Sequence, residues 1–395
     1  MGFHDLSEIS EQYVIDVING KRRKGFASYF RVFLFALSRL YRNIVQFRLT
    51  LYNTSIFRQR VLGCFVVSVG NLTTGGTGKT PVVELLARTL SKRGRRVAVL
   101  SRGYRSKPRP WWQRLKSLFS GNPEFVPPRV VSDGKNVLLD SRQAGDEPYM
   151  LARNLLKCKQ HNGVMVVVDK DRVKGGLYAI RKGADTLLLD DGFQYLRLRP
   201  WTNILLVDST NPFHNHEMLP CGMLREPIKN LRRADYIFLT KSDGSEKYRH
   251  LRQFLKRHNH QAEIIECNHV PKYLESVSDR SDTLPLSALK GSRLGVLSAI
   301  ARPDGFEKYL KELGGELVLV RRYTDHHRYR ENELEQFCAE ARKSGVDYLI
   351  TTEKDAVRLP LLKEMKLPFY FLRVEIQILH GEEHFRQCVS QICLG

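Results

Sequence analysis

A glycine-rich loop between an apolar run and a helical pattern constrains this chain more than any other feature. Residues 65–69 (FVVSV) are mostly apolar and β-branched, which predicts a buried strand, and a helical pattern begins near Lys79. The loop between them contains the run GGTGKT at positions 75–80. Glycines let several backbone N–H groups point at one anion, and the helix N-terminus adds its dipole. The order strand, glycine loop and helix therefore predicts a phosphate-binding loop.

The end of this loop carries the residue types that a nucleotide site needs. Lys79 can reach the β- and γ-phosphates, and the Thr80 hydroxyl can ligate Mg²⁺. The common pattern G-x-x-x-x-G-K-[ST] would place its first glycine at position 73, which is Thr73 here, so the loop follows the variant G-G-x-G-K-T. The residues expected to hold the phosphates are Gly75, Gly76, Thr77, Gly78, Lys79 and Thr80.

An acidic pair at the end of another apolar run complements the loop. The run TLLLDD predicts a strand that ends in Asp190 and Asp191. In α/β folds nucleotides bind at the carboxyl edge of the sheet, where such a carboxylate can hold Mg²⁺ directly or through water. An apolar run followed by Asp is common by itself, so this prediction depends on the loop upstream. The sequence leaves open which of the two carboxylates ligates the metal.

Apolar strands alternate with amphipathic helices along most of the chain, which predicts an α/β fold with mostly parallel sheets. A length of 395 residues is enough for two domains, and we place their boundary near Gly222–Pro227. The expected limits are an N-terminal extension over 1–62, a first domain over 63–222, a second over 223–379, and an end segment over 380–395 that packs back on the first domain. Further strands are expected at 96–100, 164–169, 203–208, 236–240, 293–300, 317–320, 348–352 and 369–374.

The N-terminal extension has the pattern of a basic amphipathic helix. No acidic residue lies between Asp16 and Glu84, and Arg31 and Arg39 bracket an apolar run of seven residues, VFLFALS. A transmembrane helix needs about 20 apolar residues, so this segment is too short to span. A basic helix rich in aromatic residues suits a membrane interface; the alternative is a helix packed on its own domain with a solvated basic face. The apolar residues at spacings of three and four are Phe26, Phe30, Phe33, Leu37, Leu40, Ile44, Phe47 and Leu51.

Composition narrows the class of partner. The net charge of +22 indicates an anionic partner, and no recognisable nucleic-acid-reading motif accompanies the charge, so we expect no nucleic acid. The seven cysteines form no C-x-x-C pair, which favours reduced thiols in a cytosolic compartment. His214, His216 and Cys221 could be read as metal ligands, but scattered solvated residues explain them better. A basic, aromatic segment over 105–128 reads as a surface insertion.

Several motifs together resemble the tetraacyldisaccharide 4'-kinase family, the lipid A kinases of Gram-negative bacteria. They occur in family order from about Tyr29 to Arg358, and the combination is far more specific than a phosphate-binding loop alone. Tyr195 departs from the family, which usually has His after Gly-Phe-Gln, and the segments before Phe26 and after Tyr104 are longer than typical. The matching runs are SVGNLTTGGTGKTP (68–81), SRGYRS (101–106), GDEP (145–148), DDGFQ (190–194), LPCGMLREP (219–227), DHHRY (325–329) and TTEKDAVR (351–358).

The resemblance implies a fold and a reaction. The fold would be a P-loop NTPase-like α/β/α domain and a second, smaller α/β/α domain around a cleft, preceded by the amphipathic helix. The reaction would transfer the γ-phosphoryl group of ATP, with Mg²⁺, to the 4'-hydroxyl of an acylated glucosamine disaccharide 1-phosphate. The enzyme would be peripheral to the cytoplasmic face of the bacterial inner membrane, with an anionic membrane surface as its second partner.

The resemblance also assigns residues. Asp146 of GDEP is the candidate base and His326 of the DH motif is its partner, with Lys79 as the third catalytic residue. Because Asp146 and His326 come from different halves of the chain, we expect them to meet only when the cleft closes. Without the family, Asp146 reads equally well as a helix N-cap and His326 as a polar loop residue. The residues expected to contact the substrate are Arg102, Arg225 and Glu226.

The sequence leaves two rival functional classes open. A membrane-associated switch ATPase of the partition or site-selection type shares G-G-x-G-K-T and basic membrane helices, but its loop carries a lysine at the position of Thr74. A GTPase is the weaker rival, because the run TKSD at 240–243 mimics the T-K-x-D guanine motif after a strand. Lipid-dependent ATP consumption would favour the kinase over either rival.

Overall fold

The structure is a computed structural model that describes residues 16–18, 25–104, 106–107, 126–156, 158, 163–301, 303–360 and 367–394. Most of the expected insertion over 105–128, and the chain before Gly25 apart from residues 16–18, lie outside the described residues. The chain forms two compact units. Unit 1 comprises Met1–Val83, Gly176–Asn268 and Ile378–Gly395, and unit 2 comprises Glu84–Gly175 and His269–Gln377.

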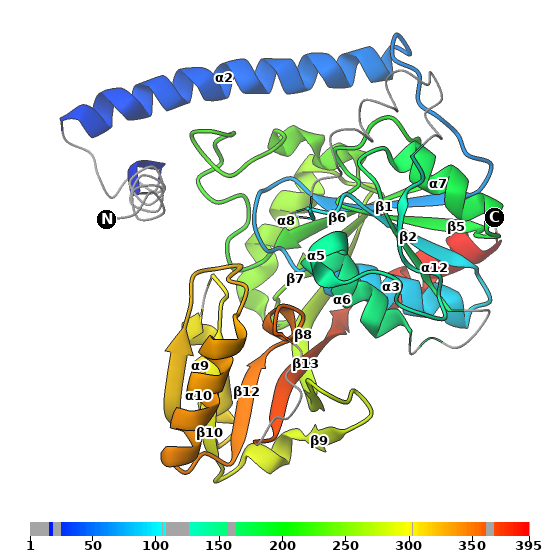
Figure 1. Ribbon diagram of the computed structural model, residues 1–395. Coiled ribbons are helices and arrows are strands. Elements are labelled where there is room, and N and C mark those ends of the chain that lie inside the picture. The colour runs from blue at the N-terminus through cyan, green and yellow to red at the C-terminus, as the bar shows by residue number, and fades with distance from the viewer. Residues whose placement is uncertain are drawn as a thin grey trace. The chain divides into compact units, whose positions relative to one another are not determined.

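The limits of these units differ from the domain limits expected at residues 62 and 222. The chain passes from one unit to the other inside four elements. These are α3 (Lys79–Lys92), α7 (Arg172–Arg181), β8 (Glu263–Ser276) and β13 (Phe369–His380). The division into domains at residues 62 and 222 stays a prediction. The ribbon of the chain is shown in Figure 1.

Unit 1 is built on a parallel sheet in the strand order β8-β7-β6-β1-β5. Its central strand β1 pairs with β5 so that Val69 lies opposite Asp190. Strands β1, β5 and β6 are almost completely buried, as expected of continuous apolar runs in a parallel sheet. The elements that lie wholly in unit 1 are α2 (Phe26–Asn53), β1 (Phe65–Asn71), β5 (Thr186–Asp190), β6 (Thr202–Asp208), η2 (Ile228–Arg233), β7 (Tyr236–Thr240), η3 (Glu246–Tyr248), α8 (Arg249–His258) and α12 (Glu382–Leu394).

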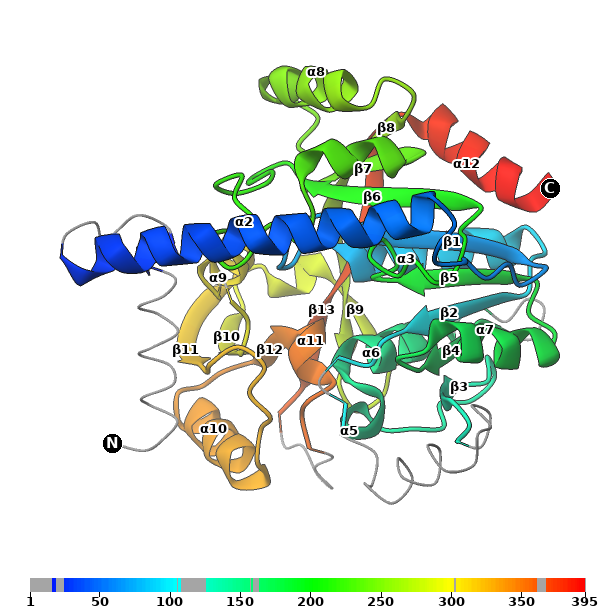
Figure 2. The same ribbon diagram turned by 90° about the horizontal axis from the view of Figure 1, so that it is seen from above.

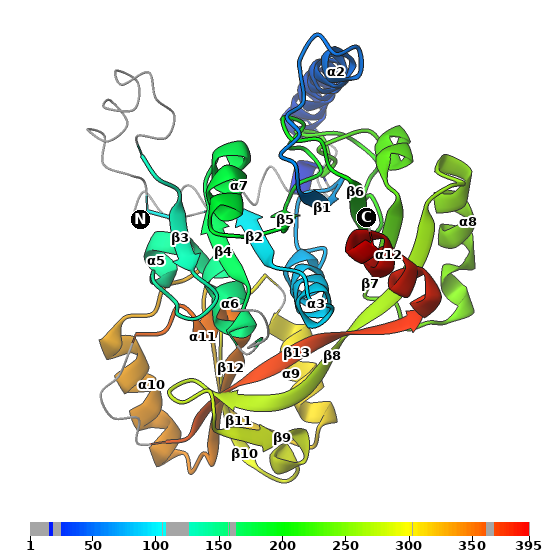
Figure 3. The same ribbon diagram turned by 90° about the vertical axis from the view of Figure 1, so that its right-hand side faces the viewer.

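Alternate residues of β7 point to opposite faces of this sheet and bury different helices. On one face, Phe238 makes an edge-to-face ring contact with Phe385 of α12 at 6.2 Å, and the Tyr236 hydroxyl donates to Gln391 at 2.9 Å. On the other face, Ile237 and Leu239 belong to an apolar cluster that α8 and the second half of α2 cover. Figure 3 shows α12 beside β7. The expected packing of 380–395 on the 63–222 domain stays a prediction, because β7 lies beyond residue 222.

Helix α2 forms where the sequence predicts it, but its predicted apolar stripe is not the face that packs on unit 1. Tyr41 and Val45 pack against the apolar cluster of unit 1, and the Ser38 hydroxyl donates to the Met218 carbonyl at 3.0 Å. Phe33 and Phe47 of the stripe are 56% and 66% exposed. Figure 2 shows α2 running across β6 and β1. Among the described helices, none is both long enough and apolar enough to cross a membrane.

Unit 2 contains two sheet segments. One has the order β2-β4-β3, with β3 antiparallel to β4, and the other has the order β11-β10-β12-β13-β8, with β9 antiparallel to β8. The elements that lie wholly in unit 2 are β2 (Val97–Ser101), β3 (Arg129–Ser132), α5 (Ser141–Ala144), α6 (Asp146–Leu155), β4 (Met165–Val168), β9 (Thr283–Pro285), η4 (Leu286–Leu289), β10 (Arg293–Ser298), α9 (Pro303–Glu312), β11 (Glu316–Arg322), α10 (Glu331–Lys343), β12 (Tyr348–Thr352) and α11 (Glu353–Ala356).

The second of these sheet segments is covered on both faces. Leu349 of β12 packs with Phe337 of α10 in one apolar cluster, whereas its neighbour Ile350 packs with Leu310 of α9 in another. The alternation of side chains along β12 therefore separates the two helices into two layers, with the strands between them. The predicted mixed α/β fold with a leading amphipathic helix is confirmed. The prediction missed β8, whose alternation is broken by charged residues and by Pro271.

A buried ionic cluster joins the two chain segments of unit 2. Arg373 donates to both carboxylate oxygens of Glu353, at 2.7 and 2.9 Å, and also to Glu84. The Asn154 amide donates to Glu84 at 2.9 Å and to Glu353 at 2.6 Å, and Arg88 pairs with Glu84 at 2.8 Å. Burial raises the pKa of Glu353 although Arg373 opposes it. Because Glu353 is the first residue of α11, the cluster ties the start of α11 to Glu84 and Asn154 of the other chain segment.

Candidate active site

The phosphate-binding loop of unit 1 has the backbone that the sequence predicts. Gly75 and Gly78 adopt φ angles of 110° and 80°, which residues other than glycine rarely adopt. A Cβ atom at Gly75 or Gly76 would meet nothing within 4 Å, so the loop faces open space there. Within the described residues, the buried Thr77 hydroxyl has no hydrogen-bond partner. The loop therefore combines positive φ angles with open space at Gly75 and Gly76, which fits an anionic ligand bound by backbone N–H groups.

Close packing fixes this loop to the acidic turn after β5. A Cβ atom at Gly70 would lie 2.6 Å from the Cβ and 2.8 Å from the amide nitrogen of Phe193, so only glycine fits. The same turn is held by Gln194, whose amide donates to the Asn71 carbonyl at 3.0 Å. The motifs SVGN and DDGFQ are thus packed against each other at the ends of adjacent parallel strands.

Side chains at the ends of two further strands of unit 1, β6 and β7, hold the phosphate-binding loop in place. Lys241 donates through Nζ to the Gly76 carbonyl at 2.9 Å and to Asp208 at 2.5 Å, and the Thr240 hydroxyl donates to the Thr77 carbonyl at 2.9 Å. Burial raises the pKa of Asp208, but hydrogen bonds from Lys241 and its neighbours outweigh burial and lower it. No motif in the sequence indicates this supporting role for residues 240–241.

The cationic side chains of the site converge on Asp191. Arg225 Nη1 lies 2.9 and 2.8 Å from the two carboxylate oxygens of Asp191, and Lys79 Nζ lies 3.4 Å from one of them. Lys79 also donates to the Asn71 side-chain carbonyl at 3.2 Å. Asp190 is buried at the end of β5, and Thr80 is buried in the first turn of α3. Of the predicted phosphate and metal residues, the structure thus brings Lys79, Asp191 and Arg225 into direct contact.

The donor set at this edge suits a small hard cation. Thr80, Asp190 and Asp191 offer oxygen atoms, which Mg²⁺ prefers, and the loop beside them suits the phosphates that complete its coordination. By contrast, the described residues contain no group of three or more His, Cys, Asp or Glu side chains arranged to hold a metal ion, and this includes His214, His216 and Cys221. The choice between Asp190 and Asp191 as ligand stays open.

Glu226 is almost completely buried, and its carboxylate supports the protein itself. It accepts hydrogen bonds from Gln194 at 3.1 Å, from Asn230 at 2.7 Å and from Arg233 at 2.6 Å. Arg233 also lies over the Phe193 ring, 4.1 Å from its centroid. These contacts anchor the DDGFQ turn, and the substrate contact expected of Glu226 stays a prediction.

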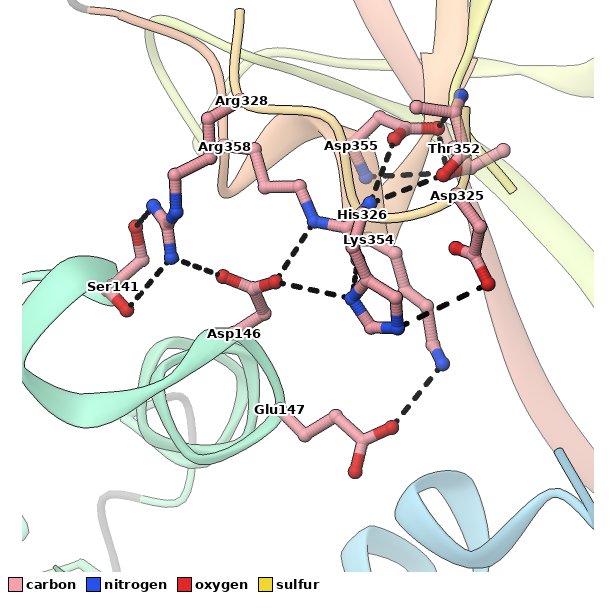
Figure 4. Close-up of polar contacts among 11 residues, drawn as sticks. Ser141, Asp146, Glu147, Asp325, His326, Arg328, Thr352, Lys354, Asp355 and Arg358 are labelled. Atoms are coloured by element: carbon pink, nitrogen blue, oxygen red, sulfur yellow. Dashed lines mark hydrogen bonds and ion pairs between the residues drawn. The ribbon is translucent and has the colours of Figure 1, made fainter. Parts of the chain in front are cut away.

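A second group of polar residues lies in unit 2 and is drawn in Figure 4. Asp146 is the first residue of α6 and follows Gly145, whose φ is 94°. His326 lies in the loop after β11 with a φ of 68°, and Arg358 follows α11. The structure therefore brings Asp146 and His326 into one unit. Their encounter does not require the closure that we expected from their separation in sequence.

Two arginines clamp the Asp146 carboxylate. Arg328 Nη2 donates to Oδ1 at 2.7 Å, and Arg358 Nε donates to Oδ2 at 2.9 Å. His326 Nδ1 lies farther away, 3.7 Å from Oδ2. Burial by itself raises the pKa of Asp146, but the charges of Arg358 and Arg328 and the hydrogen bond from Arg358 act against burial, and the pKa is lowered. Asp146 is thus held ionised and keeps the lone pairs that a base needs.

Two arginines of this group have a role that the sequence did not predict. Arg328 and Arg358 belong to the motifs DHHRY and TTEKDAVR, but the sequence reasoning assigned neither a role; their positions inside matching motifs were the available signal. Lys354 of the second motif pairs with Glu147 at 3.2 Å. Arg102 is exposed directly after β2, in unit 2, and its predicted substrate contact stays a prediction.

Comparisons with known proteins agree on one family. Residues 30–393 match the family model described as "Tetraacyldisaccharide-1-P 4'-kinase". A tetraacyldisaccharide 4'-kinase of Halothermothrix orenii is 32% identical, with 96% of this chain and 97% of the relative covered. One of Geobacter metallireducens is 40% identical, with 85% and 91% covered. The crystal structure of LpxK from Aquifex aeolicus in complex with ATP matches with a TM-score of 0.70 at 29% identity, covering 92% of this chain and 99% of that chain.

The arginine clamp predicts a pH-dependent contribution of Asp146 to stability. Because the folded state lowers the pKa of Asp146, its stabilisation is fully present above the ordinary carboxyl pKa of about 4 and is lost as the pH falls through the lowered value. At pH 7, Asp146→Asn should cost on the order of 3 kcal/mol, since it leaves the buried Arg358 partly unpaired. Urea unfolding at pH 7 and at about pH 3 or below measures the difference, which should shrink at the lower pH. Asp325→Asn, which removes a more exposed carboxylate nearby, is the control and should show neither effect.

Proposed function

The chain belongs to the tetraacyldisaccharide-1-phosphate 4'-kinase family, and from this we propose that it phosphorylates the 4'-hydroxyl of an acylated glucosamine disaccharide 1-phosphate with ATP. The observation that carries the proposal is the GGTGKT loop, whose Lys79 contacts the Asp191 carboxylate after β5. A loop of this kind places a nucleotide triphosphate with its γ-phosphate at the lysine and its metal at the carboxylates. The enzyme is therefore a phosphotransferase of lipid A biosynthesis.

The residues of unit 1 have separate roles toward ATP and Mg²⁺. The backbone of residues 75–80 binds the phosphates, Thr80 with Asp190 or Asp191 holds Mg²⁺, and Lys79 and Arg225 lie where they neutralise charge on the transferred group. Mg²⁺ held there would supply charge stabilisation to the phosphates. Lys241 and Thr240 keep the loop in place through the Gly76 and Thr77 carbonyls.

Asp146 is the proposed proton acceptor. As the 4'-oxygen forms its bond to the γ-phosphorus, the bond from that phosphorus to the β–γ bridging oxygen breaks, ADP leaves and the hydroxyl proton moves to the Asp146 carboxylate. Each carboxylate oxygen accepts one arginine donor, so each retains a lone pair for the hydroxyl. His326 is the proposed partner of Asp146, and Arg358 contacts both residues.

The comparisons do not favour the rival classes. The relatives that match almost the whole chain are kinases, and Thr74 occupies the position of the lysine that identifies the switch ATPases. The backbone N–H of Thr74 donates to the Met223 carbonyl at 2.7 Å. In the GTPase-like run TKSD, the exposed Asp243 is paired with Lys247, and Lys241 supports the phosphate loop.

We also propose that α2 binds the cytoplasmic face of the inner membrane. The proposal is supported by the exposed stripe that contains Phe33, Leu40 and Phe47, since an apolar stripe of this size left outside the core is typical of an interfacial helix. Arg39 and Arg42 lie on either side of Leu40 in the sequence and supply positive charge that would attract anionic headgroups. The acylated substrate would reach the enzyme from this surface.

The nucleotide assignment predicts that Lys79→Ala lowers phosphate transfer by on the order of 10²–10³-fold, because one cation aimed at the transferred group is lost. The assay follows transfer from [γ-³²P]ATP to disaccharide 1-phosphate by thin-layer chromatography. Lys92→Ala, at the exposed end of the same helix, is the matched control and should keep activity. Wild-type turnover in a folded Lys79→Ala enzyme would disprove the phosphate-loop assignment.

The base assignment predicts that Asp146→Asn lowers kcat by on the order of 10²–10⁴-fold with ATP binding largely preserved. His326→Ala should lower kcat as well, and the double variant should be little slower than the slower single variant, because residues that act as a unit are not additive. Steady-state kinetics with calorimetric ATP titration test this. Multiplicative losses would instead assign His326 an independent contact with the substrate.

The membrane assignment predicts that replacing Phe33, Leu40 and Phe47 by Ser moves the enzyme from vesicles to the supernatant in a flotation assay. A side chain that inserts fully contributes about 1.5–3 kcal/mol to membrane binding. Even if the three side chains insert only in part, losing them should lower partitioning by at least about 10-fold. Reversing the charge of Arg39 and Arg42 should weaken binding to anionic vesicles in a salt-sensitive way. The control replaces the exposed Ile56 and Val61, outside the helix, by Ser. Unchanged flotation of the triple variant would exclude α2 as the anchor.

A further inference from the structure

We propose that Arg358 is a positioning residue that bridges Asp146 and His326, fixes the protonated nitrogen of His326 as Nε2, and so leaves Asp146 as the proton acceptor of the pair. One edge of its guanidinium reaches both residues: Nε donates to Asp146 Oδ2 at 2.9 Å, and Nη2 lies 3.0 Å from His326 Nδ1. The assignment of Asp146 as acceptor rests on the proposed function, whereas the tautomer assignment does not.

The tautomer follows from donor chemistry. An arginine nitrogen only donates, so the His326 Nδ1 that it faces must be the acceptor and cannot carry a proton. A neutral imidazole then carries its proton on Nε2. That nitrogen lies 3.9 Å from Asp325 Oδ2 and points away from Asp146. Figure 4 shows Arg358 and Asp146 on the same side of the ring.

The same geometry explains why Asp146 and His326 do not bond directly. Their closest atoms, Oδ2 and Nδ1, are 3.7 Å apart, and both are acceptors when the neutral imidazole carries its proton on Nε2. A direct hydrogen bond between them would require a proton on Nδ1, where Arg358 already donates. The guanidinium therefore replaces the missing hydrogen bond with two of its own.

The guanidinium is held rigidly from its buried side. Its Nη1 donates to the Ala299 carbonyl at 3.1 Å and to Asp355 Oδ1 at 3.2 Å, and the Arg358 side chain is 1% exposed. Asp355 is fixed in turn, because its Oδ2 accepts from the Thr352 hydroxyl at 2.6 Å and from the Ala299 N–H at 3.1 Å. Planar, multiply bonded arginine is pre-organised for such a bridge, and lysine is not.

The competing explanation is that Arg358 only pairs with Asp355 inside the fold. The two explanations differ in what happens to the His326 ring and to Asp146 when the fold is kept. The charged and titratable groups that surround the bridge must be considered in any pH measurement: Asp146, Asp325, Arg328, Tyr329 and Asp355.

The first test is the tautomer of His326, read from ¹⁵N-labelled histidine by long-range ¹H–¹⁵N NMR of the full-length enzyme, with the signal assigned by its loss in His326→Gln. The wild type should show the Nε2–H tautomer. Arg358→Met, which keeps the apolar stem and removes the donors, should shift His326 toward Nδ1–H, since Asp146 Oδ2 then attracts that proton. Arg328→Met, which removes the other clamp on Asp146, is the control and should leave the tautomer unchanged.

The second test is kinetic. Arg358→Met should lower kcat on the order of 10²-fold with the KM for ATP unchanged. Loss of the adjacent cation raises the pKa of Asp146, so the acid limb of kcat/KM should move to higher pH. Compared with Arg358→Met, Arg358→Lys keeps a positive charge beside Asp355 but cannot donate to Asp146 and His326 together. It should therefore unfold at nearly the wild-type urea concentration and still have a low kcat.

The outcomes separate the two ideas. An Nδ1–H tautomer in the wild type, or an Nε2–H tautomer that persists in folded Arg358→Met, would overturn the positioning role. If Arg358→Lys restores both kcat and the free energy of unfolding, the role of Arg358 is only its ion pair with Asp355. A wild type with the Nε2–H tautomer but no transfer to the disaccharide would contradict the proposed function and leave the tautomer assignment standing.

Discussion

The contact between Gly70 and Phe193 is the constraint on which the nucleotide site depends. Adjacent parallel strands β1 and β5 end at the same edge, and the turn after β5 can fold across the end of β1 only because residue 70 has no side chain. This close packing places Asp191 beside Lys79. The polar contacts of Gln194 and Glu226 then hold the turn in that position. A single missing Cβ atom therefore determines whether the phosphate-binding loop and the carboxylates proposed to hold the metal lie together.

Charge is compensated differently in the two parts of the catalytic apparatus. In unit 1 the cations Lys79 and Arg225 contact a carboxylate from which incoming phosphates can draw them, because these side chains are partly exposed. In unit 2 the cation Arg358 is buried and has four partners, so it cannot leave without a large cost. The first arrangement suits ligand binding, and the second suits the fixed orientation of a base.

Helix α2 has one apolar face that packs on the core of unit 1 and one that stays exposed. Its residues Tyr41 and Val45 complete the apolar cluster of unit 1, whereas the stripe with Phe33 and Phe47 stays outside that core. An exposed stripe costs stability in water, since apolar area remains hydrated. Its retention is explained if the membrane covers it, which links the charge pattern of the N-terminal segment to the lipid nature of the substrate.

The sequence by itself determined the fold class, the phosphate-binding loop and the family, because these depend on local order: strand, glycines, lysine and threonine lie within one short stretch. It also identified Asp146 and His326, through motifs. Only the tertiary structure decided that Arg358 lies between those two residues and that Lys241 supports the loop. These contacts join positions as far apart as 146 and 358, and 76 and 241. Neither spacing nor periodicity records such contacts, since burial and packing, which the chain acquires only on folding, create them.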